Sequence, residues 1–450
     1  MTARLLLFTV YCCVSGGPFG LEALVGTSGA GMALLLILLI PIVWALPDAL
    51  ITAELAAAMP KEGGYYQWVK QALGIPWAFM NGWWTYIYAL IDAALYPIYF
   101  GDTAGQILAS LTGDDWFTSA QAEPLQWGIG LALIAVLTLA NLRGSVSVGR
   151  LSGLLTALVV VPFAVMALVA AVRWNQAPPA AYPGAFLIEG QTWRESLQLG
   201  LGIALWNYLG WDSLSTIAGE VKDPGRAYPF ALMLGIPLVT IVYFVAVATG
   251  LRFVPDPAQW TEGAWPVIAQ AIGGPWLFWG MSVGALAGLA GLFVATFLGS
   301  SRLPFVMARD GFLPAALVRL HPKFGTPWVA ILFGAACYAV LSWYFSFREL
   351  LELNVILYAT ALFTEGLSMV WFRRNRPDMP RPFRVPGPTW VAGAIAAVPA
   401  FIVIGFVSLN VMEEGLAAQI PTMVALLSGP VAWFALRNRY QPQAQTPETP

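Results

Sequence analysis

Long apolar stretches alternate with short polar segments along the whole chain. Each stretch holds roughly 20 apolar residues, the length of an α-helix that crosses the hydrocarbon core of a bilayer. They are apolar around the whole helical circumference and too long for the alternating strands of a membrane barrel. The pattern therefore predicts an all-α membrane protein. Twelve candidate spans fall at residues 4–28, 31–58, 76–108, 125–142, 150–172, 196–220, 227–251, 276–301, 327–345, 350–372, 388–409 and 418–436.

Two of these spans are interrupted near the middle. In the first, residues 16–20 read GGPFG, and Pro18 lacks the amide hydrogen that a continuous helix needs. In the sixth, polar residues and Gly210 occupy positions 207–213, which fall where the bilayer centre is expected. Five spans occupy residues 4–172 and five occupy 196–372, so each break lies in the first helix of its set. Matching breaks of this kind indicate a transporter built from two inverted repeats, with its site at the membrane midplane.

Composition agrees with this interpretation and excludes several classes of protein. Hydrophobic residues make up 58% of the chain and charged residues only 10%, whereas soluble domains carry about 25% charged residues. The net charge of −2 argues against nucleic acid as a partner. His321 is the only histidine and the cysteines are three, so we expect no metal site, no disulfide framework and no cofactor. No nucleophile–base pair or phosphate loop suggests an enzyme.

Lysine and arginine are distributed asymmetrically over the predicted loops. If the N-terminus is cytoplasmic, 18 of the 22 lie on the cytoplasmic side, and only Arg173, Arg194, Arg252 and Arg348 lie outside. Because cytoplasmic loops are enriched in Lys and Arg, we expect both termini in the cytoplasm and a multi-pass protein of the plasma (inner) membrane.

Three further segments are predicted not to span the membrane. Residues 60–70 indicate an interfacial helix with its aromatic side chains toward lipid and Lys61 and Lys70 toward the cytoplasm. Residues 264–272 indicate a second short helix, on the outer side. The polar, proline-rich residues 441–450 are expected to be disordered.

Acidic residues occur in or near the spans without any lysine or arginine inside a span. They are Glu22, Asp48, Glu54, Asp92, Asp102, Asp212, Glu220 and Glu365. A buried carboxylate without a partner is costly, so it takes up a proton or holds a cation. This asymmetry favours protons, metal cations or amines as the charged species that the protein handles.

Some of these acids also have a purely structural explanation. Glu22 follows the first break and would offset the positive end of the half-helix that begins there. Asp212 would serve as the N-cap of the second half of the sixth span. Asp92, deep in the third span, has no such explanation. Solvated or interfacial positions near span ends are expected for Asp48, Asp102 and Glu365.

Two of the acids lie toward the cytoplasmic side. Glu54 and Glu220 are predicted either to take part in proton coupling or to form gate salt bridges with loop cations such as Arg226 or Arg309.

The broken helices supply candidate groups for both ends of an amino acid. The amides of Gly17, Phe19 and Gly20, at the start of a half-helix, suit a carboxylate. Free carbonyl groups on the other side of each break, together with the Asp212 side chain, suit an amine.

Aromatic residues flank the second break. Trp206, Tyr208 and Trp211 would hold an ammonium group by cation–π attraction, with about 0.5–2 kcal/mol from each ring. An amino acid would use both kinds of group. A polyamine would use only the acidic and aromatic half, with Glu22 or Asp92 taking its second amine.

Several motifs in this order resemble the amino acid–polyamine–organocation superfamily, most of all the branch of polyamine uptake transporters beside the L-type amino acid transporters. The motifs are GGPFGLE at residues 16–22, IVWALPDALITAE at 42–54, GGYYQWV at 63–69, GWW at 82–84, IDAALYP at 91–97, WNYLGWDSLSTIAGEVKD at 206–223 and MARDGFLP at 307–314. The similarity is clear over the first ten spans, whereas the last two match by hydropathy and by the RPFRVP sequence at 381–386.

This resemblance implies the leucine-transporter-type fold, a 5+5 inverted repeat that works by alternating access. It implies one transmembrane domain over residues 1–436, made of repeats at 4–172 and 196–372 and two additional helices at 388–436, followed by a cytoplasmic tail at 437–450. Relatives of this kind place the substrate at the two breaks. The implied substrate-binding residues are Gly16, Gly17, Pro18, Phe19, Gly20, Trp206, Tyr208, Trp211 and Asp212.

The resulting hypothesis is a secondary active transporter of amino acids or polyamines, driven by proton symport. The residues predicted for proton coupling or gating are Glu22, Glu54, Asp92 and Glu220. Two alternatives stay open: an amino acid exchanger that needs no ion, and a membrane sensor that binds an amine without moving it. Some proton-coupled relatives carry a lysine in the fifth span, which residues 151–173 lack.

Overall fold

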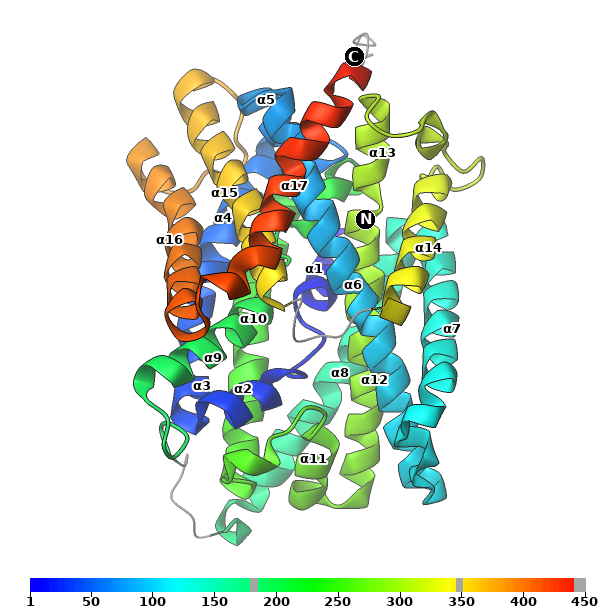
Figure 1. Cartoon of the computed structure of the whole chain (residues 1–450), viewed down its shortest axis with the longest axis vertical. Coiled ribbons are helices and arrows are strands. Elements are labelled where there is room, and N and C mark those ends of the chain that lie inside the picture. The colour runs from blue at the N-terminus through cyan, green and yellow to red at the C-terminus, as the bar shows by residue number, and fades with distance from the viewer. Residues whose placement is uncertain (179–184, 345–350, 441–450) are drawn as a thin grey trace.

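The computed structural model describes residues 1–178, 185–344 and 351–440, and within these ranges every regular element is a helix. The predicted disordered tail at 441–450 lies outside the described residues. Most of the long helices run along the long axis of the molecule (Figure 1). The α-helices are α1 (Ala3–Val14), α2 (Leu21–Ser28), α3 (Ala30–Ile40), α4 (Leu46–Ala58), α5 (Gly64–Ala72), α6 (Ile75–Thr112), α7 (Glu123–Leu142), α8 (Ser145–Val172), α9 (Trp193–Trp206), α10 (Pro224–Phe253), α11 (Trp265–Gly273), α12 (Pro275–Ser300), α13 (Arg302–Arg309), α14 (Trp328–Tyr344), α15 (Leu351–Asn375), α16 (Thr389–Glu414) and α17 (Ile420–Leu436).

In the described part of the chain, eight helical segments are long and apolar enough to cross a bilayer. They correspond to eight of the predicted spans. Of the other four predicted spans, one is the 38-residue α6 and one is the shorter α14. The remaining two are the interrupted spans, each of which forms two separate helical pieces. The chain is a multi-pass, all-helical membrane protein.

Large apolar side chains are exposed on the outer faces of these helices. Examples are Leu38, Val136, Leu168, Ile241 and Val431. Water would not favour so many exposed leucine and valine side chains on one molecule. Their distribution fits contact with lipid.

Both predicted breaks are present. α1 ends at Val14 and α2 starts at Leu21, while α9 ends at Trp206 and the 3₁₀ helix η5 (Ser213–Glu220) follows the second break. The chain can turn here because Gly17 and Gly210 have φ values of 99° and 94°, a region that L-residues with side chains rarely adopt.

The short helices are where they were predicted, but the surroundings of one differ. α11 matches the predicted segment at 264–272. α5 matches residues 60–70, yet Tyr65, Tyr66 and Trp68 are at most 1% exposed, so the prediction that they face lipid was wrong. They pack inside the protein because α5 lies against α6, α15 and η5.

Two acids predicted near span ends are instead fully buried. Asp48 and Glu365 are both 0% exposed. Asp48 lies on α4, which a π-helical turn, η1 (Pro41–Ala45), joins to α3, and α4 is covered by α10, α15 and α16. Glu365 lies on α15, which α6 and α16 cover. The prediction of solvated positions was therefore wrong for both residues.

Candidate substrate site

The two breaks lie next to each other in the centre of the molecule. A side-chain carbon added to Gly20 would lie 3.4 Å from the Trp206 ring, and one added to Gly210 would lie 3.2 Å from the carbonyl oxygen of Cys13. A small cavity of about 30 Å³ separates the breaks. This volume is enough for about one water molecule, so the site is closed around its centre in this conformation. Its walls include Gly16, Phe19, Tyr88, Asp92, Tyr96, Trp206, Asn207, Gly210, Ser213 and Asn354.

Asp92 is the acidic side chain on the wall of this inner cavity. Its Oδ2 accepts a hydrogen bond from the Tyr96 hydroxyl at 2.6 Å, and its Oδ1 accepts from Trp206 Nε1 and from Asn354 Nδ2, both at 3.1 Å. A carboxylate has about four acceptor positions. Three are used here, which leaves one for a donor from a bound substrate.

Asp212 occupies a different environment from Asp92. It does not line either of the cavities next to the breaks, and it accepts a hydrogen bond from the Tyr358 hydroxyl at 2.8 Å. It stands at the N-cap position of η5, but its side chain makes no capping hydrogen bond. The N-cap explanation therefore lacks support.

The aromatic residues at the second break separate into two groups. Trp206 lines the cavity, beside Asp92. Tyr208 is buried, and its hydroxyl donates to the carbonyl of Ile37 at 3.0 Å. Trp211 is 1% exposed and packs against Gly235 of α10. Neither Tyr208 nor Trp211 lines a cavity next to the breaks in this conformation.

The amides at the first break are largely engaged within the protein. Gly17 N donates to Ser15 Oγ at 3.1 Å, and Gly20 N donates to Glu22 Oε2 at 2.8 Å. The Pro18 carbonyl accepts from Trp265 Nε1 at 2.8 Å. In this conformation, two of the three amides expected to receive a substrate carboxylate therefore already have partners.

Glu22 accepts hydrogen bonds from two backbone amides, one in the first break and one in the loop before α11. Besides Gly20, its Oε1 accepts from the amide of Gly263 at 3.1 Å, and the residue is 2% exposed. A carboxylate at the N-terminal end of α2 is favoured by the helix dipole. This geometry agrees with the structural explanation of Glu22.

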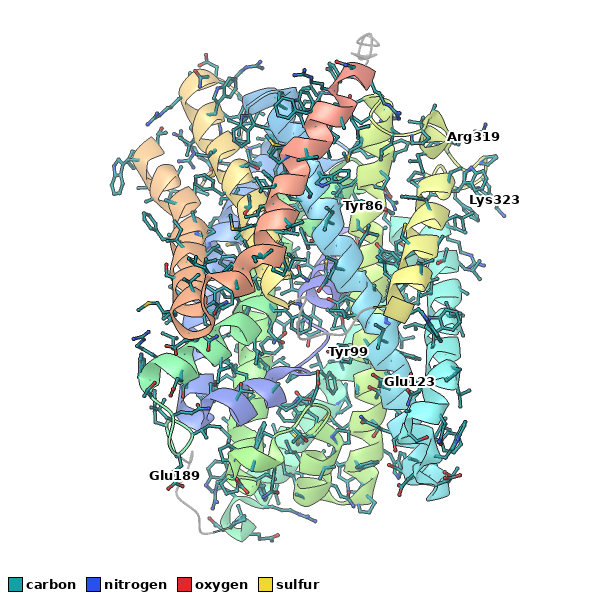
Figure 2. The ribbon with its side chains drawn as sticks, in the orientation of Figure 1. Tyr86, Tyr99, Glu123, Glu189, Arg319 and Lys323 are labelled. Carbon is teal, nitrogen blue, oxygen red and sulfur yellow. The ribbon has the colours of Figure 1, made fainter. Side chains whose placement is uncertain are left out.

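A larger cavity of about 230 Å³ continues from the inner one and shares Gly16, Phe19, Tyr96, Trp206 and Leu292 with it. We call it the vestibule. Tyr99 of α6 lines it and lies in the half of the molecule that carries Glu123 and Glu189 (Figure 2). Its acidic wall residues are Glu22, Asp102 and Glu262. In the described residues, no lysine or arginine lines either cavity.

The opposite half of the molecule is held together by ion pairs. Arg302 is fully buried and bonds Glu220 at 2.9 Å, while Lys70 bonds Asp310 at 2.6 Å. Arg309 lies 3.6 Å from a third acid, Glu62. Lys70 lies on α5, and Arg302 and Arg309 lie on α13. Both helices lie in the upper half of Figure 1, the half that carries Arg319 and Lys323 in Figure 2.

The two cytoplasmic-side acids do form salt bridges, but not with Arg226 or Arg309, the partners that were named. Glu54 pairs with Arg373 at the end of α15, and both side chains are 1% exposed. It also lies 3.6 Å from Arg381, in the loop after α15. Glu220 pairs with Arg302 at the start of α13. Arg226 contacts Asp223 instead, at 3.8 Å. Sequence reasoning missed these pairs because the helices extend beyond the predicted spans and so carry the arginines into buried positions.

Close contact between α12 and the first break gives a testable prediction. A side-chain carbon on Gly288 would overlap the carbonyl oxygen of Gly16. Overpacking of this kind costs about 1–3 kcal/mol, so we expect Gly288→Ala to displace the break and to lower transport at least about fivefold. Gly280→Ala on the same helix is the control, since it has open space around it. Equal uptake by both variants would show that the break tolerates displacement.

The fold and the acid-lined breaks define a class of protein, the multi-pass membrane transporter. Comparison with known sequences is specific about the family: the profile of the family described as "Amino acid permease" matches residues 5–433. The chain therefore belongs to the amino acid permease family, in the amino acid–polyamine–organocation superfamily. This is a family of transporters, so the chain is not an enzyme.

Individual relatives cover nearly the whole chain. Polyamine transporter PUT1 of Oryza sativa subsp. japonica is 34% identical over 99% of this chain and 80% of its own length. Polyamine transporter RMV1 of Arabidopsis thaliana is 34% identical over 94% of this chain and 84% of its own. Branched-chain amino acid permease BcaP of Bacillus subtilis is 25% identical over 94% of this chain and 90% of its own.

Proposed function

We propose that the chain is a secondary active transporter of organic amines, with polyamines as its preferred substrates. The observation that carries this proposal is the acidic character of the two cavities at the breaks. Asp92 lines the inner cavity, Asp102 and Glu262 line the vestibule, and no lysine or arginine of the described residues offsets them there. Such a path attracts a polycation and repels an anion.

The first break supports a polyamine over an amino acid. An amino acid needs donors for its carboxylate, and the amides of Gly17 and Gly20 are held by Ser15 and Glu22. A polyamine needs no such donors. The names of two relatives, polyamine transporters PUT1 and RMV1, agree with this preference.

The topology that we propose has twelve spans in a single domain over residues 1–436. Residues 4–172 and 196–372 form a 5+5 inverted repeat, 388–436 add two helices, and 437–450 form a tail. Both termini lie on the cytoplasmic side, which is the end of the molecule that carries Arg319 and Lys323 (Figure 2), and the membrane is the plasma membrane. The excess of Lys and Arg at this end supports the orientation.

With this orientation, we propose that the protein transports its substrate by alternating access. The vestibule faces outward, while the ion pairs Arg302–Glu220 and Lys70–Asp310 close the cytoplasmic half. Substrate enters through the vestibule and reaches Asp92, and the cytoplasmic pairs then separate to release it. We propose that an inward proton gradient drives this cycle by symport.

The proposal is tested with purified protein in liposomes. Uptake of radiolabelled putrescine, spermidine and a panel of amino acids is measured with and without an inward proton gradient. We expect saturable polyamine uptake that the gradient drives above equilibrium. Uptake that requires internal substrate and ignores the gradient would instead identify an exchanger, and binding without flux would identify a sensor.

The acidic vestibule should distinguish polyamines by the number of positive charges that they carry. Asp102 is partly exposed and Glu262 is exposed. Replacing Asp102 with asparagine, or Glu262 with glutamine, removes a charge whose attraction for a bound amine is worth about 0.5–1 kcal/mol. We expect the KM for spermidine to rise about two- to fivefold, and the KM for putrescine to rise less because it carries fewer charges. High salt should reduce the difference. Asp115→Asn, at an exposed position of a short 3₁₀ helix outside the vestibule, is the control; an equal change in that variant would contradict a local role.

A further inference from the structure

A second group of acids lies behind the substrate cavity. Asp48 on α4, Asp212 at the second break and Glu365 on α15 are each at most 1% exposed and close enough to interact electrostatically. None of them lines the inner cavity or the vestibule. The other titratable groups that face them are Cys13 on α1, Tyr65 on α5, Tyr88 on α6 and Tyr358 on α15.

Arginine does not neutralise this cluster. The buried arginines Arg302 and Arg373 are each paired with a glutamate elsewhere, Glu220 and Glu54. In the part of the chain that the structure describes, no lysine or arginine is within ion-pair distance of Asp48, Asp212 or Glu365. Their charges must be removed in another way, since buried carboxylates without counter-ions are strongly disfavoured.

The hydrogen bonds at Tyr358 require an additional proton. Its hydroxyl oxygen is within hydrogen-bond distance of Asp212 Oδ1, at 2.8 Å, and also of Asp48 Oδ2. A hydroxyl has only one hydrogen to donate. It therefore satisfies one carboxyl group, and the other must carry its own hydrogen and donate it to the tyrosine oxygen. Two oxygens facing each other without a hydrogen would repel.

Unsatisfied atoms next to Glu365 point to the same conclusion. Glu365 Oε1 is 3.5 Å from Asn81 Nδ2, while Glu365 Oε2 and Asn81 Oδ1 are both buried without a hydrogen-bond partner among the described residues. Buried polar atoms are normally satisfied. A hydrogen on Glu365 would supply the missing donor in this part of the cluster.

From this geometry we infer that Asp48, Asp212, Glu365 and Tyr358 form a proton-binding site that is separate from the substrate cavity. Oxygens at hydrogen-bond separation are bridged by hydrogen, and within the described residues no acidic cluster has the arrangement to hold a metal ion. The inference deepens the proposed function and rests on it, because it assigns the place where the symported proton binds.

The site is linked directly to the second break. Gly210 N donates to the Tyr358 hydroxyl at 3.1 Å, and Gly210 also lines the inner cavity. A proton from the outer water binds one carboxylate oxygen and forms an O–H bond. The same bond breaks when the proton leaves toward the cytoplasm. Loss of the proton leaves two carboxylates competing for one hydroxyl, which forces the Gly210 segment to rearrange. Asp92 remains free for the substrate.

The test compares coupling with transport in liposomes. For the wild type, we expect an inward gradient of one pH unit to accumulate spermidine above equilibrium and to acidify the interior. Asp48→Asn and Glu365→Gln should still equilibrate spermidine but lose at least about 80% of the gradient-driven accumulation. Asp115→Asn is the control. Accumulation that both variants retain in full would overturn the inference, whereas absence of uptake by the wild type would overturn the proposed function instead.

Two further measurements cover variants that do not fold and a different driving ion. The infrared carbonyl band of a protonated carboxylic acid should be present in the wild type at neutral pH and smaller in Asp48→Asn or in the milder Tyr358→Phe. A wild type without this band overturns the inference even if every variant is unstable. Accumulation driven by a sodium gradient, and not by protons, overturns it as well.

Discussion

Replacing Asp92 with asparagine is expected to reduce polyamine uptake at low substrate concentration by about 30-fold or more. Loss of a buried charge pair costs at least about 2 kcal/mol, and each 1.4 kcal/mol is about tenfold. The substitution removes charge with little change in shape. Asparagine Oδ1 can accept from Trp206 and Asn354 as Asp92 does, and its amide can donate to the Tyr96 hydroxyl.

The measurement is the concentration dependence of putrescine and spermidine uptake in liposomes. Trp206→Phe is a useful companion variant, because it removes the hydrogen bond to Asp92 but keeps an aromatic ring and the charge. We expect polyamine uptake by Trp206→Phe to be several-fold lower than uptake by the wild type and much higher than uptake by Asp92→Asn. An unchanged KM in Asp92→Asn would place the amine elsewhere, and Asp102 or Glu262 in the vestibule would be the next residues to test.

The two breaks could be predicted from sequence because their signal is local. Pro18 restricts the backbone at its own position, whereas Gly17 and Gly210 allow conformations that other residues rarely adopt. No distant contact is needed to recognise either effect. Asp92 could be singled out for a similar reason, since its depth in an apolar span is visible in the sequence. The pattern also predicted eight of the spans that are long enough to cross a bilayer.

The partners of the acids could not be predicted, because they come from distant parts of the chain. Tyr358 is 146 residues from Asp212, and Asn354 is 262 residues from Asp92. Nothing in the sequence marks either residue on α15 as a ligand of an acid at the breaks. α5 shows the same limit: an apolar face can be read from its sequence, but whether lipid or protein covers that face depends on how the helices pack.

Asp48 shows that the packing around a helix decides whether a residue on it is buried. Sequence placed it near the end of the second span. In the structure, Asp48 lies in a helical segment that runs from Ala30 to Ala58 through the π-helical turn η1, and α10, α15 and α16 cover this segment at α4. Its Oδ2 accepts a hydrogen bond from the Tyr358 hydroxyl in the interior. Turns of this kind often accompany functional sites in helices.

The second large effect is expected for stability, at the ion pair between Glu54 and Arg373. Glu54→Gln should destabilise the folded protein by about 3–5 kcal/mol, because removing one partner leaves the other charge buried and uncompensated. Arg373 Nε donates to Glu54 Oε1 at 2.8 Å, Nη2 bonds Glu54 Oε2, and Val385 N donates to the same carboxyl at 2.8 Å. The pair therefore fastens the segment after α15 to α4.

Thermal unfolding in detergent, followed by the fraction of protein that remains soluble and monodisperse, measures this effect. The double variant Glu54→Leu/Arg373→Met replaces the closest pair with two apolar side chains that need no counter-ion, so it should recover part of the loss. The recovery stays partial because Arg381, 3.6 Å from Glu54 Oε1, also loses its acid. Glu54 was one of the acids predicted for proton coupling or gating. If its role is structural, as the pair suggests, the protons moved per spermidine should be unchanged in whatever fraction of Glu54→Gln folds. A change in that ratio would return Glu54 to the coupling mechanism.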